Sequence, residues 1–257
     1  MFGMSELFII IILGVVQGLT EFLPISSSGH LFLLENIFGI SGSDQLFLTV
    51  ILHFGTLIAV VIYYYKDILA LIKTDHKRLW WLILATLPAT IVMLFVKKLL
   101  ANGFDNRFLP FGFLLTAILL IFASKKQATS KEFTAKTALI MGVGQAVAVF
   151  PAISRSGTTI CVGLLVGADK KQVANFSFLM SIPVILGSTI VELMDINTFG
   201  ISLLNLSVGV VCSLLSGLIA IHFMLKLVQK AKLWVFSVYL FALFALTLTN
   251  AFFVPLW

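Results

Sequence analysis

Continuous apolar segments of membrane-spanning length are the feature that most constrains how this chain can fold. Six of them recur along the sequence, at residues 47–65, 79–96, 108–123, 174–193, 201–225 and 234–256. Each is close to the roughly 20 residues that a helix needs to cross a bilayer. Strands of a membrane barrel would instead alternate apolar and polar residues over about 10 positions. We therefore predict an all-α polytopic membrane protein with about six transmembrane helices.

The overall composition supports this class. Hydrophobic residues make up 60% of the chain and charged residues 11%, whereas soluble domains carry roughly 45 to 50% and about 25%. The net charge of +6 would suggest a nucleic-acid partner in a soluble protein. Here the lysines and arginines lie mainly in short loops between apolar segments, so they indicate membrane topology. We predict no nucleic-acid partner.

An internal repeat divides the chain into halves. The window GVVQGLTEFLPISSSG, residues 14–29, aligns without gaps on GVGQAVAVFPAISRSG, residues 142–157, with 8 of 16 positions identical and an offset of 128. The matches include polar residues and not only hydrophobic ones, which favours duplication over chance. We predict a single integral membrane domain over residues 1–257, built from two repeats of about 1–128 and 129–257.

The loop charges predict opposite orientations for the two repeats. If the loop 66–78 lies inside and the six spans alternate, most loop lysines and arginines fall inside, as the positive-inside rule requires. Segments 1–44 and 137–169 must then each enter and leave by one face, as re-entrant helical hairpins. Short broken helices in matching halves point to a binding site near the bilayer midplane. We therefore expect the two hairpin tips to face each other.

The first tip gathers polar side chains between two short apolar stretches. Its candidate residues are Gln17, Glu21, Ser26, Ser27, Ser28, Gly29 and His30. Gln17 and Glu21 are four residues apart, so both side chains project from one helical face. The serines and glycine precede the next half-helix, a composition suited to capping its exposed amides. A helix start of this kind attracts anions.

The second tip carries an arginine where the first carries a serine. Its candidate residues are Ser154, Arg155, Ser156 and Thr159. A guanidinium among hydroxyls and helix-start amides has the composition of a phosphate clamp. A charge at the bilayer centre costs about 2.5 to 3.5 kcal/mol, so Glu21 and Arg155 are functional candidates. The alternatives are a purely structural ion pair and, for each hydroxyl, an interhelical hydrogen bond. We interpret His53, in an apolar run, as a core histidine.

Two motifs carry a resemblance to a known family. QGLTEFLPISSSGH, from Gln17 to His30, and PAISRSGTT, from Pro151 to Thr159, resemble the two signatures of the bacterial undecaprenyl-diphosphatase family of the bacitracin-resistance type. The resemblance extends to the order, size and spacing of the halves over the whole chain. One position departs from the pattern, because Ala152 stands where the family usually has glycine.

The resemblance implies a function. It indicates an integral membrane phosphatase, a phosphoric anhydride hydrolase, that removes the terminal phosphate of undecaprenyl diphosphate. This reaction recycles the carrier lipid for peptidoglycan synthesis and confers bacitracin resistance. The resemblance also implies a divalent cation, Mg²⁺ or Ca²⁺, a location in the bacterial cytoplasmic (inner) membrane, and an active site opening toward the outer face.

Residue roles follow from this substrate. We predict Ser27 as nucleophile, His30 as general base or acid, Glu21 as the residue that orients His30 or holds the metal, and Arg155 as the clamp on the diphosphate. A phosphohistidine at His30 is the alternative. Supporting contacts to phosphate or metal are predicted for Gln17, Ser26, Ser28, Gly29, Ser154, Ser156 and Thr159.

A second functional class stays open at this point. Inverted repeats with broken helices are also the plan of secondary transporters, so the chain could move an anion or flip a lipid phosphate. The expected partners are a polyprenyl diphosphate substrate and membrane lipid. The sequence leaves the oligomeric state open, with a homodimer as one candidate.

Overall fold

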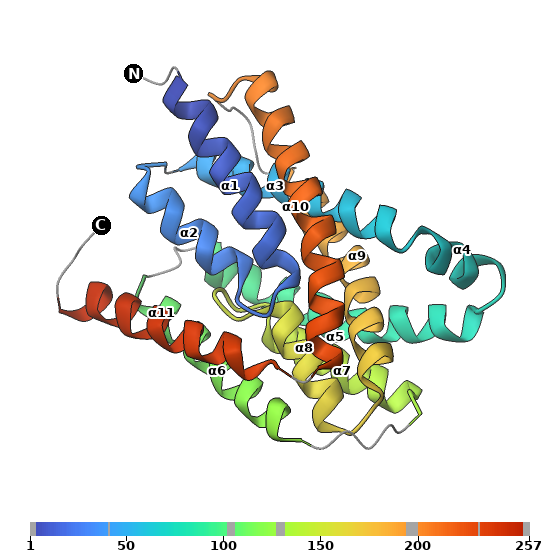
Figure 1. Ribbon diagram of the computed structural model, residues 1–257. Helices are drawn as coiled ribbons and strands as arrows, with labels where there is room; N and C mark the ends of the chain where they lie inside the picture. The colour runs from blue at the N-terminus through green and yellow to red at the C-terminus, as the bar shows by residue number, and fades with distance from the viewer. Residues whose placement is uncertain are drawn as a thin grey trace.

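The computed structural model describes residues 4–40, 42–101, 106–126, 132–193, 200–230 and 232–253, and every regular element in these ranges is helical. The helices are α1 (Met4–Phe22), α2 (Ser27–Ile37), α3 (Ser43–Tyr63), α4 (Tyr65–Lys73), α5 (His76–Ala101), η1 (Asn106–Phe108), α6 (Leu109–Lys125), α7 (Ala135–Val147), α8 (Arg155–Leu165), α9 (Lys170–Leu193), α10 (Leu203–Gln229) and α11 (Trp234–Phe252). Figure 1 shows their arrangement.

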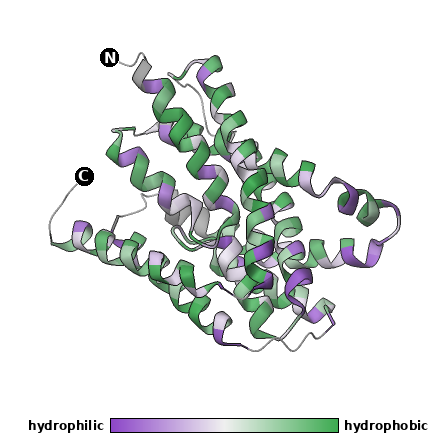
Figure 2. Cartoon of the chain, viewed as in Figure 1, coloured by the Kyte–Doolittle hydropathy of each residue, from purple (hydrophilic) through white to green (hydrophobic). Residues whose placement is uncertain are grey.

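The predicted all-α polytopic architecture is confirmed. Five helices in the described ranges, α3, α5, α9, α10 and α11, are long and apolar enough to cross a bilayer. At the remaining predicted span, residues 108–123, α6 is a shorter apolar helix of 17 residues. Hydrophobic residues dominate the outer helices, as Figure 2 shows for α11. Large side chains such as Phe95 and Leu203 are about four-fifths exposed, as expected where lipid covers the surface.

The two broken segments form helical hairpins, α1 with α2 and α7 with α8. The helices α2, α7 and α8 have 11, 13 and 11 residues, too few to cross a bilayer. Helix α1 is longer, with 19 residues. The lengths of α2, α7 and α8 are consistent with re-entrant hairpins. The orientation of the hairpins in the membrane stays a prediction.

Helix packing follows the internal repeat. Adding 128 to the residue numbers of α1 and α5 gives approximately the ranges of α7 and α10. Helix α1 packs along α10, visible side by side in Figure 1, and α7 packs along α5. The same offset relates α3 to α9 and α6 to α11, and each of these pairs is also in contact. The halves therefore interlock and do not form separate units.

One predicted loop contains a helix. The segment 66–78 was expected to be an irregular loop, but its first part forms α4. Ile68, Leu71 and Ile72 recur at helical spacing, and Leu71 is buried against the protein. The lysines at both ends of α4 hide this short apolar face in the sequence pattern.

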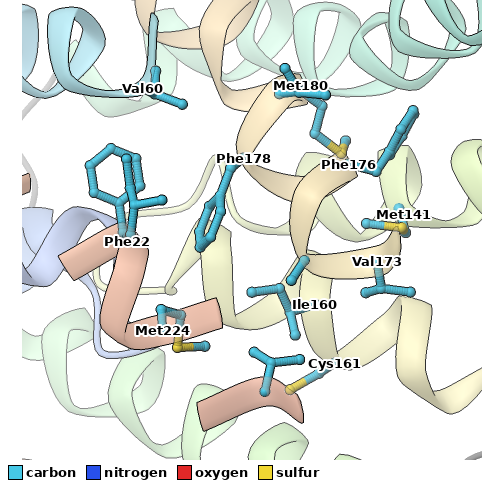
Figure 3. Close-up of a cluster of buried hydrophobic side chains, with 14 of the residues drawn as sticks. Phe22, Val60, Met141, Ile160, Cys161, Val173, Phe176, Phe178, Met180 and Met224 are labelled. Atoms are coloured by element: carbon cyan, nitrogen blue, oxygen red, sulfur yellow. The ribbon is translucent and has the colours of Figure 1, made fainter. Parts of the chain in front are cut away.

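A close-packed core anchors the tip of the first hairpin. Phe22, which directly follows Glu21, is fully buried and packs edge-on against Phe178 with ring centroids 5.6 Å apart. Figure 3 shows this pair beside Ile160 and Met224, so α1, α8, α9 and α10 all contribute. A Cβ atom at Gly18 would lie 2.4 Å from the carbonyl oxygen of Ser213. Helix α1 can therefore approach α10 only with a glycine there.

Candidate active site

The two hairpin tips meet, as predicted. Ser156 of the second tip donates its hydroxyl to the carbonyl of Leu23 at the end of α1, at 3.0 Å. Arg155 of the second tip forms an ion pair with Glu21 of the first. The halves of the chain therefore join at one polar point inside a largely apolar protein.

Both tips present the first residue of a helix to this point. Helix α2 begins at Ser27, and Ser26 before it accepts a hydrogen bond from the Gly29 amide at 3.3 Å. Helix α8 begins at Arg155, and Ser154 accepts from the Gly157 amide at 3.0 Å. Ser27 and Arg155 thus occupy equivalent positions in the two repeats. The partial positive charge of both helix starts favours an anion between them.

Glu21 is the centre of the cluster. Its side chain is about 5% exposed. Its Oε2 accepts hydrogen bonds from the Ser27 hydroxyl at 2.6 Å and from Gln17 Nε2 at 3.1 Å, and its Oε1 pairs with Arg155 Nη2. His53 Nε2 lies 3.4 Å from Oε2. One buried carboxylate therefore holds a hydroxyl, an amide, a guanidinium and an imidazole.

Two buried polar atoms of the cluster lack hydrogen-bond partners within the described part of the chain. They are Gln17 Oε1, an acceptor, and Arg155 Nη1, a donor. Burying such atoms without partners is costly. The guanidinium therefore has one donor, and the Gln17 amide one acceptor, that no described group of the protein uses.

His30 makes hydrogen bonds away from Ser27. Its Nδ1 lies 2.7 Å from the Ser26 carbonyl oxygen, so Nδ1 carries a proton. Its Nε2 lies 2.6 Å from the hydroxyl of Tyr239, and the two rings stack with centroids 5.6 Å apart. His30 was predicted as the acid–base partner of Ser27. In the structure the Ser27 hydroxyl donates its hydrogen bond to the carboxylate of Glu21.

His53 is the site residue that sequence reasoning missed. It lies on α3, and its Nδ1 bonds the Thr49 carbonyl at 2.8 Å while Nε2 faces Glu21. A carbonyl oxygen accepts only, so Nδ1 holds a proton and Nε2 is the ring nitrogen that faces the carboxylate. The sequence held one signal for this role, because an ionisable side chain within a membrane span commonly marks a functional site.

The other predicted residues hold the tips in shape. Thr159 donates to the Arg155 carbonyl at 2.8 Å and lies 2.6 Å from the Ser177 hydroxyl, which links α8 to α9. The Ser154 amide donates to Thr116 on α6 at 3.1 Å. Ser28 is exposed, 3.4 Å from the Ser26 hydroxyl. Contacts of Ser26, Ser28, Gly29, Ser154, Ser156 and Thr159 with a substrate stay predictions.

Ala152 adopts the backbone conformation that its position demands. Its φ angle is 63°, in the left-handed region, and its side chain is fully buried. Glycine is the residue that enters this region at no steric cost. The tip therefore keeps its path with alanine at a cost of about 1 kcal/mol.

The donor set suits a hard cation shared with a substrate. Within the described ranges, three or more histidine, cysteine, aspartate or glutamate side chains do not converge at any point. The carboxylate of Glu21 and the unpartnered Gln17 Oε1 are oxygen ligands of the kind that Mg²⁺ and Ca²⁺ prefer. Mg²⁺ in particular is commonly held by one or two carboxylates together with substrate phosphates. The residues fit such a cation.

Known proteins resemble this chain along most of its length. The family model described as bacitracin resistance protein BacA matches residues 10–246. A protein of Halothermothrix orenii named undecaprenyl-diphosphatase is 41% identical, covering 91% of this chain and 94% of its own. The protein of that name from Carboxydothermus hydrogenoformans is 41% identical, with coverage of 91% and 93%. Undecaprenyl-diphosphatase 4 of Bacillus cereus is 40% identical, with coverage of 94% and 96%.

These matches cover both hairpins and the spans between them. Identity near 40% over nine-tenths of each chain, together with the family match, decides the family. The chain belongs to the bacitracin resistance protein BacA family.

Proposed function

We propose that this protein hydrolyses undecaprenyl diphosphate to undecaprenyl phosphate and inorganic phosphate, and so recycles the lipid carrier for peptidoglycan synthesis and contributes to bacitracin resistance. The observation that carries the proposal is the meeting of Ser27, Glu21 and Arg155 where two helix starts converge. A nucleophile, a proton acceptor and an anion clamp are the groups that phosphoryl transfer needs. The names of the relatives agree with this reaction.

Binding begins with charge neutralisation. The diphosphate oxygens take the unpartnered Nη1 of Arg155 and lie at the start of α2 and α8. The anion then competes with Glu21 for the guanidinium, which releases carboxylate charge beside Ser27. Arginine suits this step because its planar fork matches phosphate oxygens and stays charged in a poorly hydrated site.

Ser27 then attacks the terminal phosphorus. The bond from that phosphorus to the bridging oxygen breaks, and the bridging oxygen leaves with undecaprenyl phosphate. The hydroxyl proton passes to Glu21 Oε2, 2.6 Å away. His53 Nε2 lies 3.4 Å from the same oxygen. Water next attacks the phosphoserine and the bond from phosphorus to Ser27 Oγ breaks. Oγ takes back the proton held by Glu21, and one proton of the water passes through the freed carboxylate to solvent as inorganic phosphate leaves. Attack by His30 would first require its Nε2 bond to Tyr239 to break, so the serine route is favoured.

A divalent cation, Mg²⁺ or Ca²⁺, fits this scheme. Glu21 and Gln17 would hold it, and when bound it would supply positive charge to the diphosphate. The lysine-rich segments on one side of the predicted topology support a multi-pass protein of the cytoplasmic membrane whose site opens toward the outer face.

Phosphate release from undecaprenyl diphosphate by the purified protein in detergent tests the proposal. We expect release by the wild type, suppression by a chelator, recovery on adding Mg²⁺, and a loss of orders of magnitude in the Ser27→Ala protein. Absence of release, together with movement of a lipid phosphate across vesicles by the same preparation, would replace the enzyme with a transporter.

A further inference from the structure

We propose that the corner formed by α4, α5 and α9 binds one anionic glycerophospholipid, with an acyl chain in an apolar pocket and the headgroup phosphate on the α4–α5 turn. This site is separate from the hairpin tips, and the inference goes beyond the proposed hydrolysis. It depends on a cavity, a set of cations and the exposure of α5.

The cavity is a pocket of about 360 Å³ between three helices. Ile68 and Leu71 of α4, Leu82 and Leu87 of α5, and Leu179 and Pro183 of α9 are among the side chains that line it. Its volume is within the usual range for small-ligand sites. Pro183 within α9 has no backbone N–H, so one helical hydrogen bond is missing at this wall.

The lining offers water nothing to bind. Thr86 is the one polar side chain among the described residues that line the pocket, and its hydroxyl already donates to the Leu82 carbonyl at 2.8 Å. A buried water needs two to four polar partners, and cavities without them stay dry. The complement of this pocket is therefore an apolar chain.

Basic residues stand at one end of the pocket. Ile72 and Leu79 line it beside the turn between α4 and α5, and Lys73 and Arg78 are their neighbours in sequence. Figure 2 shows this turn as hydrophilic against the hydrophobic helices. Lys77 lies on the same turn, with Nζ 5.1 Å from the ring centroid of Trp81.

These cations are only partly balanced. Asp75 lies 3.5 Å from Arg78 Nε, and both side chains are well exposed, so the pair neutralises little. The turn therefore carries a net positive charge beside the apolar pocket, with Asp75 as its carboxylate and three cations, Lys73, Lys77 and Arg78. An apolar cavity with a basic mouth matches a lipid that carries a phosphate.

The exposure of α5 favours lipid over a second copy of the chain. Only 17% of the α5 span is buried inside the protein, the smallest share among the five long apolar helices of the described ranges. Trp80 is 63% exposed beside the turn, a typical position for an aromatic residue at a membrane interface. A twofold copy packed on this corner would bring like charges together.

Native mass spectrometry in a nonionic detergent tests the proposal. The probes are phosphatidylglycerol and phosphatidylcholine with the same acyl chains, and the variants are Lys73→Gln/Lys77→Gln for the cations and Ile83→Trp for the pocket. Ile83 lines the pocket and is 43% exposed, so a larger side chain can be accommodated. Lys125→Gln/Lys126→Gln at the end of α6 is the matched control.

We expect phosphatidylglycerol to bind the wild type and the control alike and phosphatidylcholine to bind less. Each lost cation should weaken the binding of phosphatidylglycerol about fivefold, which gives roughly 25-fold for the double variant. Ile83→Trp should reduce the binding of both lipids. Melting temperatures equal to that of the wild type verify that the variants fold. If Ile83→Trp melts at a lower temperature, Thr86→Leu serves as the pocket variant, because Thr86 also lines the pocket.

Equal binding of the two lipids, normal binding by Lys73→Gln/Lys77→Gln, or a dimer whose formation these substitutions abolish would overturn the proposal. Binding of undecaprenyl phosphate but not of phosphatidylglycerol would also overturn it. Phosphate release by these variants is expected to be normal, so failure of the lipid site and failure of the proposed hydrolysis give different results.

Discussion

Arg155 and Glu21 form a buried ion pair that joins the two hairpins across 134 residues of sequence. Each charge is costly in a membrane interior, and each partly offsets the cost of the other. The pair also leaves Arg155 Nη1 without a partner. The same contact therefore holds the tips together and leaves one donor for the anion that we propose as substrate.

Replacing Arg155 should affect stability and catalysis separately. Arg155→Ala leaves the Glu21 carboxylate buried without its cation, so we expect a loss of about 3 to 5 kcal/mol of stability and at least a 100-fold loss of phosphate release. Glu21→Gln/Arg155→Ala should recover much of the melting temperature but none of the activity. Full activity in either protein would contradict the clamp role.

Replacing Ser27 tests the nucleophile. Ser27→Ala should lower kcat by at least 1,000-fold because no phosphoserine can form, and mass spectrometry of rapidly quenched wild type should find phosphate on Ser27. Ser207→Ala on α10 is the matched control, since that hydroxyl is exposed and donates to the Leu203 carbonyl of its own helix. Phosphate trapped on His30 would transfer the nucleophilic role to that residue.

The sequence predicts the two tips well and their internal contacts less well. Gln17, Glu21, Ser27 and Arg155 were identifiable because polar residues at helix breaks within apolar segments have few structural explanations. The partners of His30 were not, because Tyr239 is 209 residues away on α11 and no local pattern connects them. Helix α4 was not predictable either, because lysines flank its short apolar face.

His53 should contribute to proton transfer although it comes from a different helix. His53→Gln removes the imidazole 3.4 Å from Glu21 Oε2, so we expect kcat to fall about 10- to 100-fold with a smaller change in KM. His222→Gln on α10, an exposed position, should leave kcat unchanged. A wild-type kcat in His53→Gln would mean that His53 has a structural role and takes no part in proton transfer.

The hydrogen bond from Tyr239 tests whether the placement of His30 matters. Tyr239→Phe keeps the stacked ring at 5.6 Å but removes the hydroxyl 2.6 Å from Nε2. We expect a several-fold fall in kcat with a melting temperature lowered by only about 2 to 4 °C, because a net hydrogen bond contributes about 1 kcal/mol. Tyr64→Phe, which removes a bond to Asn175, is the control. An unaltered kcat in Tyr239→Phe would show that this bond has no part in the reaction.

Gln17 tests the assignment of the metal. Its Oε1 is a buried acceptor without a partner in the described residues, and a carboxylate there would give a divalent cation a second charged ligand. Gln17→Glu should therefore lower the Mg²⁺ concentration needed for half-maximal phosphate release several-fold, and Gln17→Leu should raise it. Titrating Mg²⁺ into chelator-treated protein measures both effects.

Gln145→Glu, at the equivalent position of the second repeat, serves as the matched control, because the counterpart of Glu21 there is Val149. Equal Mg²⁺ dependence in wild type, Gln17→Glu and Gln17→Leu would mean that Gln17 does not ligate the cation.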